Sequence, residues 1–201
     1  MLLFCEGRKL SSADHDWNDV LTRRSTDGGE SWGDLQIVRS ESTVDKHVTI
    51  GNPAPVALTT QPGTVVLIFC RDNMDVAQMK STDFGATWTE PVYFAFGQSQ
   101  QFRHMLGTPP GKNISHIATG PPTSIELASG RIIVPTAFCY DGGFETCKSD
   151  APGDWFAATF YTDDLETWKI SNKELGGNEC QASQVRKTPR WPRSWANFNL
   201  L

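Results

Sequence analysis

The sequence predicts an all-β protein, part of a β-propeller with about three blades. An octet with the pattern hydroxyl, any residue, Asp, any residue, Gly, any residue, hydroxyl, Trp occurs at 25–32 and 81–88, and it returns in altered form at 161–168. Apolar runs of strand-like composition lie on both sides of each octet. These runs group into four-stranded meanders with the octet at the third hairpin, as in propeller blades. Three copies of one pattern between strands indicate a repeat architecture.

Each octet is predicted to close a hairpin turn. Its Asp carboxylate accepts hydrogen bonds from backbone amides of the same turn. The Gly takes a positive φ without a steric penalty, and the Trp packs its ring under the hairpin. We therefore assign structural rather than catalytic roles to the acidic and indole side chains of the octets. These are Asp27, Trp32, Asp83, Trp88, Asp163 and Trp168.

The apolar runs divide into three units. The first lacks an opening strand and has strands at 2–5, 20–25 and 35–39. The second has strands at 55–59, 64–71, 76–81 and 87–96, and the third at 124–127, 131–140, 156–162 and 167–174. The segments between the runs, 98–117 and 141–154, are expected to be loops. Pro135 suggests a bulge within its strand, and 179–185 would open a fourth unit.

The chain is expected to have two parts, a propeller at 1–185 and an irregular tail at 186–201. The tail is basic and contains Trp as well as Pro. Such a composition invites a nucleic-acid interpretation. However, the formal net charge of the chain is -5, which argues against binding to phosphate backbones, and the prolines break every short run.

Composition sets further limits. With 38% apolar and 20% charged residues, the chain has the usual composition of a soluble globular protein. No apolar run approaches the roughly 18 residues of a transmembrane helix. Residues 1–5 are too short for the apolar core of a signal peptide, so the compartment stays open. Cys70 and Cys139 stand in apolar runs without zinc spacing, so we expect reduced thiols, no metal and no cofactor.

Strand parity places the candidate functional residues. Turns between the first two strands and between the last two strands of a blade lie at one rim, together with the octets. The other connections lie at the opposite rim. That opposite rim is predicted to hold Glu6, Arg8, Asp14, Asp16, Arg71 and Glu179. Carboxylates and arginines over the mouth of a propeller would form a concave, charged pocket that suits a small anion.

Several segments resemble the exo-α-sialidases, or neuraminidases, whose six-bladed propellers carry BNR repeats. The octets resemble the Asp box of that family. Residues 4–14 leading into 23–29 resemble its first blade, 51–56 its second, and 118–121 with 130–135 its third. Residues 178–181 resemble its catalytic glutamate segment. The resemblance covers 2–181, about half of the family's domain.

The resemblance implies a retaining glycoside hydrolase that removes terminal sialic acid from glycoconjugates, with Tyr as nucleophile. Asp14 falls at the position of the acid/base aspartate, and Asp16 is a near alternative. Glu179 matches the glutamate that polarises the tyrosine. Glu6 and Arg8 match residues that contact the sugar or brace its neighbours, and Arg71 is a further candidate for substrate binding at the same rim.

The chain also departs from the family's pattern. The arginine triad that binds the sugar carboxylate has no counterpart, and Tyr93, Tyr140 and Tyr161 stand in the wrong blades for the nucleophile. We therefore expect an incomplete copy with little or no activity. Exposed blade edges would favour self-association of the chain.

Other interpretations remain open. Glu6 and Arg8 could form an ordinary surface pair, Asp14 could be a loop residue, and Glu179 could flank a turn. The main alternative to an enzyme is a noncatalytic propeller that binds glycan or protein. A glycoside hydrolase of another specificity on the same scaffold is a third possibility.

Overall fold

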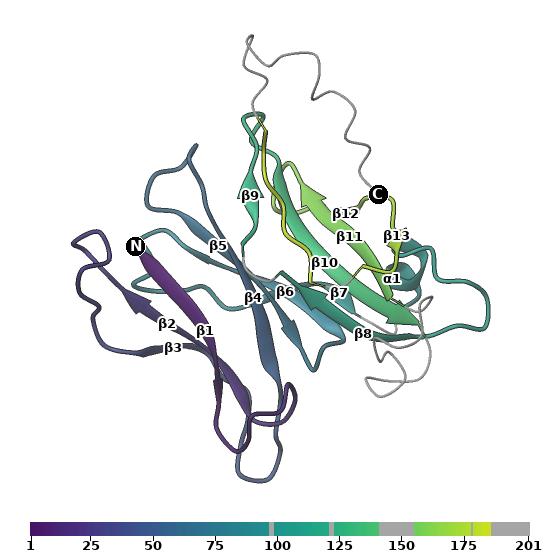
Figure 1. Cartoon of the computed structure of the whole chain (residues 1–201), viewed down its shortest axis with the longest axis horizontal. Coiled ribbons are helices and arrows are strands. Elements are labelled where there is room, and N and C mark those ends of the chain that lie inside the picture. The colour runs from purple at the N-terminus through teal and green to yellow at the C-terminus, as the bar shows by residue number, and fades with distance from the viewer. Residues whose placement is uncertain (97–98, 121–122, 141–154, 178, 186–201) are drawn as a thin grey trace.

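Three antiparallel sheets stand side by side in chain order (Figure 1). The computed structural model describes residues 1–96, 99–120, 123–140, 155–177 and 179–185. The first sheet has the order β1 (Leu2–Arg8), β2 (Asn18–Arg24), β3 (Gln36–Arg39). The second has the order β4 (Ile50–Ala57), β5 (Val65–Arg71), β6 (Asp75–Ser81), β7 (Val92–Phe96).

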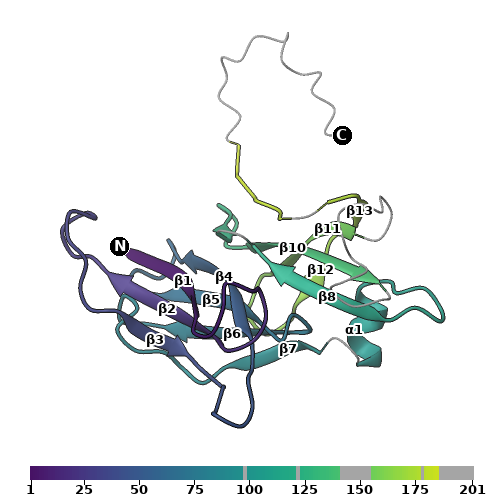
Figure 2. The same ribbon diagram turned by 60° about the horizontal axis from the view of Figure 1, so that its bottom comes forward.

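The third sheet is built in the same way. Its order is β12 (Lys169–Ile170), β11 (Trp155–Thr162), β10 (Ile132–Tyr140), β8 (Ile114–Thr119), with β9 (Ile125–Glu126) also paired to β10 and β13 (Glu174–Leu175) to β11. Figure 2 shows the three sheets from another side, with the helix α1 (Gln100–Met105) at the end of the third. The all-β prediction of a partial propeller is confirmed. The arrangement also leaves β1 at the edge of the first sheet, and self-association through that edge stays a prediction.

The middle sheet is buried on both faces, which explains why β5 is apolar without interruption. Successive side chains of a strand point to opposite faces. Leu67 and Phe69 belong to the core shared with the first sheet, whereas Val66 and Ile68 belong to the core shared with the third. All four are at most 1% exposed. Packing between sheets, rather than within one sheet, therefore holds the blades together.

The first two octets close their turns as predicted. Ser25 Oγ donates to Asp27 Oδ1 at 2.6 Å, and Asp27 Oδ1 also accepts from the amide of Ser31 at 3.0 Å. Asp83 Oδ1 likewise accepts from Ser81 Oγ at 2.8 Å and from the amide of Thr87 at 2.9 Å. The hydroxyl of Ser25 for Asp27 and that of Thr87 for Asp83 come first among the hydrogen bonds that hold the pKa of both carboxyls well below its usual value.

In the third octet the assignment of Asp163 was wrong, because its neighbour Asp164 closes the turn. Asp164 Oδ1 accepts from Thr162 Oγ1 at 3.0 Å and from the amides of Glu166 at 2.9 Å and Thr167 at 2.7 Å. The amides come first among the causes that lower the pKa of Asp164 to about 2. Counted from Thr162, whose hydroxyl takes the place of those of Ser25 and Ser81, this turn reaches its Trp one residue sooner than the others. Asp163 instead pairs with Arg131, at 2.7 and 2.9 Å.

This correction gives a direct test. Asp164→Ala is expected to lower the midpoint of urea-induced unfolding, because it leaves two turn amides and a hydroxyl without their acceptor. Asp163→Ala removes only an exposed ion pair and should lower the midpoint much less. Chemical denaturation followed by tryptophan fluorescence measures both. A larger loss for Asp163→Ala would restore the original assignment.

Three details of the second and third units differ from the prediction. The expected loop at 98–117 contains α1 and most of β8. The helix forms because Ser99 Oγ caps it by accepting from the amide of Phe102 at 3.1 Å and because Phe102 is buried. β8 and β9 both pair with β10 and together take the place of the first strand of this unit. Pro135 makes no bulge but pairs with Thr159 in regular register. It faces the gap between β8 and β9, where a missing N–H costs nothing.

Other expectations concern the remaining parts of the chain. The expected loop at 141–154 and the tail at 186–201 lie outside the described residues. Within 179–185 the structure has no strand, so the opening strand of a fourth unit is not seen there. In the described part of the chain, no helix is long and apolar enough to cross a membrane.

The cysteine prediction was wrong for Cys139, which is disulfide-bonded. Cys5, Cys70 and Cys180 are free thiols. Cys70 and Cys139 are both fully buried, so burial does not distinguish them. Pairing requires a second cysteine within disulfide reach, and tertiary structure decides this. Burial comes first among the causes that raise the pKa of the Cys70 thiol to about 12.

Candidate active site

A cluster of charged residues lies at the rim opposite the octet turns, where strand parity placed it. β1 starts beside the first octet, since Met1 and Ser25 exchange backbone hydrogen bonds at 2.9 and 2.6 Å. It ends at Arg8, which pairs with Asn18. In the second sheet the last residue of β5, Arg71, pairs with the first residue of β6, whereas the second octet follows the end of β6. The predicted rim is thus confirmed for the residues after β1 and β5.

Arg8 binds two carboxylates at once. Its Nη2 lies 3.0 Å from Glu6 Oε2 and 2.7 Å from Asp14 Oδ1, and its Nη1 donates to the carbonyl of Ser12 at 2.6 Å. Hydrogen bonding to Glu6 is the first of the causes that raise the pKa of Arg8. The side chain of Asp14 is 54% exposed, whereas that of Glu6 is 19% exposed. Asp14 is therefore held in place and still reachable from solvent.

The loop that carries Asp14 is fastened at its base. The amide of Lys9 donates to the carbonyl of Trp17 at 3.1 Å. Lys9 Nζ also lies 2.7 Å from Asp19 Oδ2 and 4.7 Å from the centre of the Trp17 ring. Because the Asp19 side chain is fully buried, it needs this ammonium as a counter-charge. The ends of the loop are fixed, and Asp14 projects from its middle.

Asp16 does not join the Arg8 cluster. Its Oδ1 lies 2.5 Å from His47 Nδ1, and its backbone exchanges hydrogen bonds with the Thr49 hydroxyl at 2.9 and 3.0 Å. Asp16 therefore ties the loop to the segment before β4. Its geometry suits a bracing role better than the acid/base role that was considered for it.

Arg71 is also occupied by carboxylates. Its Nε donates to Glu41 Oε2 at 2.8 Å, and its Nη1 lies 3.0 Å from Asp72 Oδ2. Glu41 further accepts from Arg39 Nε at 3.0 Å and from the hydroxyl of Tyr93 at 3.1 Å. This network joins the first sheet to the second, and in it Arg71 acts as a structural cation.

Within the described residues, Glu179 is not joined to the Arg8 cluster by a hydrogen bond or ion pair. It is exposed, has a φ of 50°, and follows β13, which pairs with β11. No hydrogen bond or ion pair joins Glu179 to any residue in the described part of the chain. Its role as the partner of a nucleophile therefore stays a prediction.

The three tyrosines serve the scaffold. Burial, with the Glu41 charge, raises the pKa of the Tyr93 hydroxyl above its ordinary value, the opposite of what an activated nucleophile needs. Tyr140 donates to the carbonyl of Leu106 at 3.0 Å and accepts from Lys173 Nζ at 2.7 Å. The guanidinium carbon of Arg131 lies over the ring of Tyr161, 4.8 Å from the ring centre.

Two residues near the cluster carried no signal in the sequence. Burial, which outweighs the Asp14 charge, lowers the pKa of His116 to about 4, so this imidazole is neutral at pH 7. Its ring lies 5.2 Å from that of Trp155. Asn52, in β4, donates its amide to Glu6 Oε1 at 2.7 Å. Sequence spacing joined neither residue to Asp14, because both come from other blades. Among the described residues, no group of three or more His, Cys, Asp or Glu could hold a metal.

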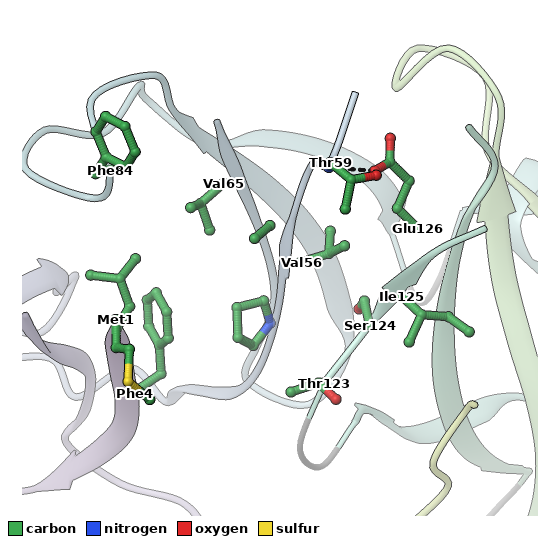
Figure 3. Close-up of a pocket in the computed structure, with 13 residues that line it drawn as sticks. Met1, Phe4, Val56, Thr59, Val65, Phe84, Thr123, Ser124, Ile125 and Glu126 are labelled. Carbon is green, nitrogen blue, oxygen red and sulfur yellow. Dashed lines mark hydrogen bonds between the residues drawn. The ribbon is translucent and has the colours of Figure 1, made fainter. Parts of the chain in front are cut away.

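The other rim holds an apolar pocket of 560 Å³ between β1, β4 and β9 (Figure 3). Phe4, Val56, Val65 and Phe84 are among its lining residues. Its carboxylate, Glu126, is already bound by the hydroxyls of Thr59 and Thr60, both at 2.5 Å. The pocket therefore presents apolar surface and a carboxylate that would repel an anionic ligand, and it shares no lining residue with the Arg8 cluster.

Comparison with known proteins agrees with this architecture. The model of the family described as BNR repeat-like domain matches residues 3–194. A sialidase of Paraclostridium sordellii is 22% identical over 189 residues, which are 86% of this chain and 43% of that protein. Among solved structures, the Hadza microbial sialidase Hz136 has a TM-score of 0.64 at 19% identity, covering 86% of this chain and 34% of that one.

A second solved structure is the Trypanosoma rangeli sialidase in complex with the inhibitor DANA. It has a TM-score of 0.63 at 13% identity, and the match covers 87% of this chain and 29% of that one. The sheets, their turns and these likenesses define a sialidase-type β-propeller. The chain belongs to the family of BNR repeat-like domains. It spans less than half the length of each of these relatives.

Proposed function

We propose that this chain carries part of the active site of an exo-α-sialidase-like glycoside hydrolase of the retaining type. The observation that supports this best is the Arg8 cluster, in which an exposed Asp14 is held at 2.7 Å from a guanidinium. In this role Asp14 protonates the leaving oxygen and then deprotonates the attacking water. The substrate would be a sialylated glycoconjugate or a small sialoside.

The nucleophile is proposed to come from outside the three tyrosines of this chain. A phenol suits an anionic sugar, because a carboxylate nucleophile would repel the carboxylate of sialic acid. Its ordinary pKa near 10 then requires a nearby base, the role proposed for Glu179.

The isolated chain is expected to bind a sialoside weakly and to turn it over little or not at all. Arg8 is shared between Glu6 and Asp14, so the cluster carries one positive and two negative charges. Arg71 is occupied by Glu41 and Asp72. Neither guanidinium is free to form a bidentate pair with the ligand carboxylate, which is the strongest contact such a ligand offers.

Two measurements on the purified chain test this proposal. Titration calorimetry with the sialidase inhibitor DANA should show weak, saturable binding that is lost in Arg8→Ala, because the released Asp14 would repel the ligand carboxylate. A fluorogenic sialoside should give turnover near the blank. Asp34→Asn, an exposed carboxylate change beyond the first octet, is the matched control and should leave binding unchanged.

Each measurement can contradict one part of the proposal. Absence of DANA binding by the native chain would remove the sialoside site. Turnover that disappears in Asp14→Asn would instead show that the chain is an active enzyme. Binding without turnover, even when the rest of a related propeller is supplied, would favour the second candidate, a noncatalytic propeller that binds glycan. The occupied arginines are the observation that favours this candidate.

A further inference from the structure

Glu6 is divided between two partners. Its Oε2 accepts from Arg8 Nε at 3.2 Å and Nη2 at 3.0 Å, whereas its Oε1 accepts from the amide of Asn52 at 2.7 Å. The carboxylate lies directly over Gly51, where an added Cβ would stand 2.6 Å from Oε1. The backbone of β4 therefore fixes which oxygen of Glu6 faces Arg8.

Asn52 presents this amide from an uncommon backbone conformation. Its φ is 54°, in the left-handed region, although it precedes Pro53, which favours extended backbone at the preceding residue. β4 loses its regular pairing with β5 at this point, between Gly51 and Ala54. Such a conformation persists only where the surroundings hold it.

Neighbouring segments supply that hold. Asn52 Nδ2 donates to Asn73 Oδ1 at 2.8 Å, and the hydroxyl of Thr119 donates to the carbonyl of Asn52 at 2.7 Å. Asn73 is itself left-handed, with a φ of 50°, and its carbonyl accepts from the amide of Ile117 at 2.7 Å. Asn52 in the second sheet is thus fixed by β8 of the third sheet and supports Glu6 of the first.

We propose that Asn52 is a positioning residue for Asp14. Its left-handed backbone aims the amide at Glu6, Glu6 orients the guanidinium of Arg8, and Arg8 holds Asp14. The functional part of this inference rests on the proposed sialoside site. Without the amide, Glu6 turns both oxygens toward Arg8 in a bidentate pair, and the guanidinium loses its alignment with Asp14.

Two substitutions at Asn52 separate the backbone from the side chain. Both Asn52→Gly and Asn52→Ala remove the hydrogen bond to Asn73. Glycine adopts a positive φ freely, whereas alanine disfavours it, so only Asn52→Ala moves the amide. The probe is hydrogen exchange at Arg8 Nε–Hε, followed by NMR on ¹⁵N-labelled protein. Exchange should be about tenfold faster in Asn52→Ala and nearly unchanged in Asn52→Gly.

Equal exchange rates in the two variants would overturn the proposal, because the effect would then belong to the side chain or to nothing. If Asn52→Ala does not fold, Thr119→Val takes its place. It removes the hydroxyl that holds the carbonyl of Asn52 and that also contacts Cys70 Sγ at 3.6 Å. Faster exchange at Arg8 supports the proposal, and an unchanged rate contradicts it.

DANA binding gives the second readout. Where the native chain binds, Asn52→Ala should raise the Kd about tenfold and Asn52→Gly should keep it within about twofold. An equal Kd in both variants would contradict a positioning role. If the native chain does not bind DANA, the proposed function fails, but the exchange rates still decide whether Asn52 orients the cluster.

Discussion

Phe160→Ala is expected to lower the free energy of unfolding by about 3–5 kcal/mol, the usual cost of removing a fully buried aromatic ring. Phe160 in β11 is 0% exposed and packs between Phe94 of β7 and Phe102 of α1, with ring centres at 5.5 and 6.1 Å. It therefore joins the second sheet, the third sheet and the helix in one core. Alanine leaves a cavity that these rigid elements cannot fill.

Equilibrium unfolding in urea at pH 7 measures this effect. Phe84→Ala is the matched control, because the same atoms are removed from a ring that is 67% exposed in the turn of the second octet. It should cost well under about 1 kcal/mol. Equal losses in the two variants would show that the second and third sheets do not share a core in solution.

Glu41→Gln is expected to cost about 2 kcal/mol at pH 7, because Arg39 and Arg71 lose a charged acceptor that is only 17% exposed. Burial alone would raise the pKa of Glu41, but hydrogen bonds from Arg71, Arg39 and Tyr93 lower it by more. A lowered pKa means that the stabilisation is fully present above the unfolded value of about 4.3. It is then lost as the pH falls through the folded value.

Unfolding of the native chain and of Glu41→Gln should therefore differ most near neutral pH, and the two curves should converge as the pH falls toward 3. Glu90→Gln is the control, since Glu90 also pairs with Arg39 but its side chain is 90% exposed. Its effect should stay within about 0.5 kcal/mol at every pH. A difference between native and Glu41→Gln that persists at acid pH would show that shape, and not charge, explains the loss.

Much of the fold could be predicted from the sequence, because local patterns determine it. The continuous apolar run of β5 and the flanking octets identify the sheets and their turns. In the third sheet the expected strand at 124–127 contains β9, but β8 was missed because most of it lies in the segment 98–117 that was expected to be a loop. The hydrogen bonds of Asp164 were also out of reach, because Asp163 has the same interval to its Trp as the acids of the other two octets and so fits the pattern better.

The candidate site was predictable where one blade supplies it. Glu6, Arg8 and Asp14 are close in the chain, and parity alone places them at one rim. The sequence carries no signal for Asn52, because it acts through its backbone amide, which donates to Glu6. It carries none for His116 either, because burial in the folded chain lowers the pKa of that imidazole. It also could not show that Arg71 is occupied by Glu41, because that contact joins two sheets.

The shortened third turn shows what a blade must retain as its sequence diverges. Leu165, with a φ of 64°, stands alone where the first octet has Gly28 and Gly29 in succession, yet Asp164 still gathers the amides beyond it. The shorter bend still lets β11 and β12 pair on either side of it, Phe160 with Ile170 and Tyr161 with Lys169. A search that demands a fixed interval between the acid and the indole finds this copy but selects Asp163, five residues before Trp168, instead of Asp164. A criterion based on a Ser or Thr and the acid two positions later would select Asp164, two positions after Thr162.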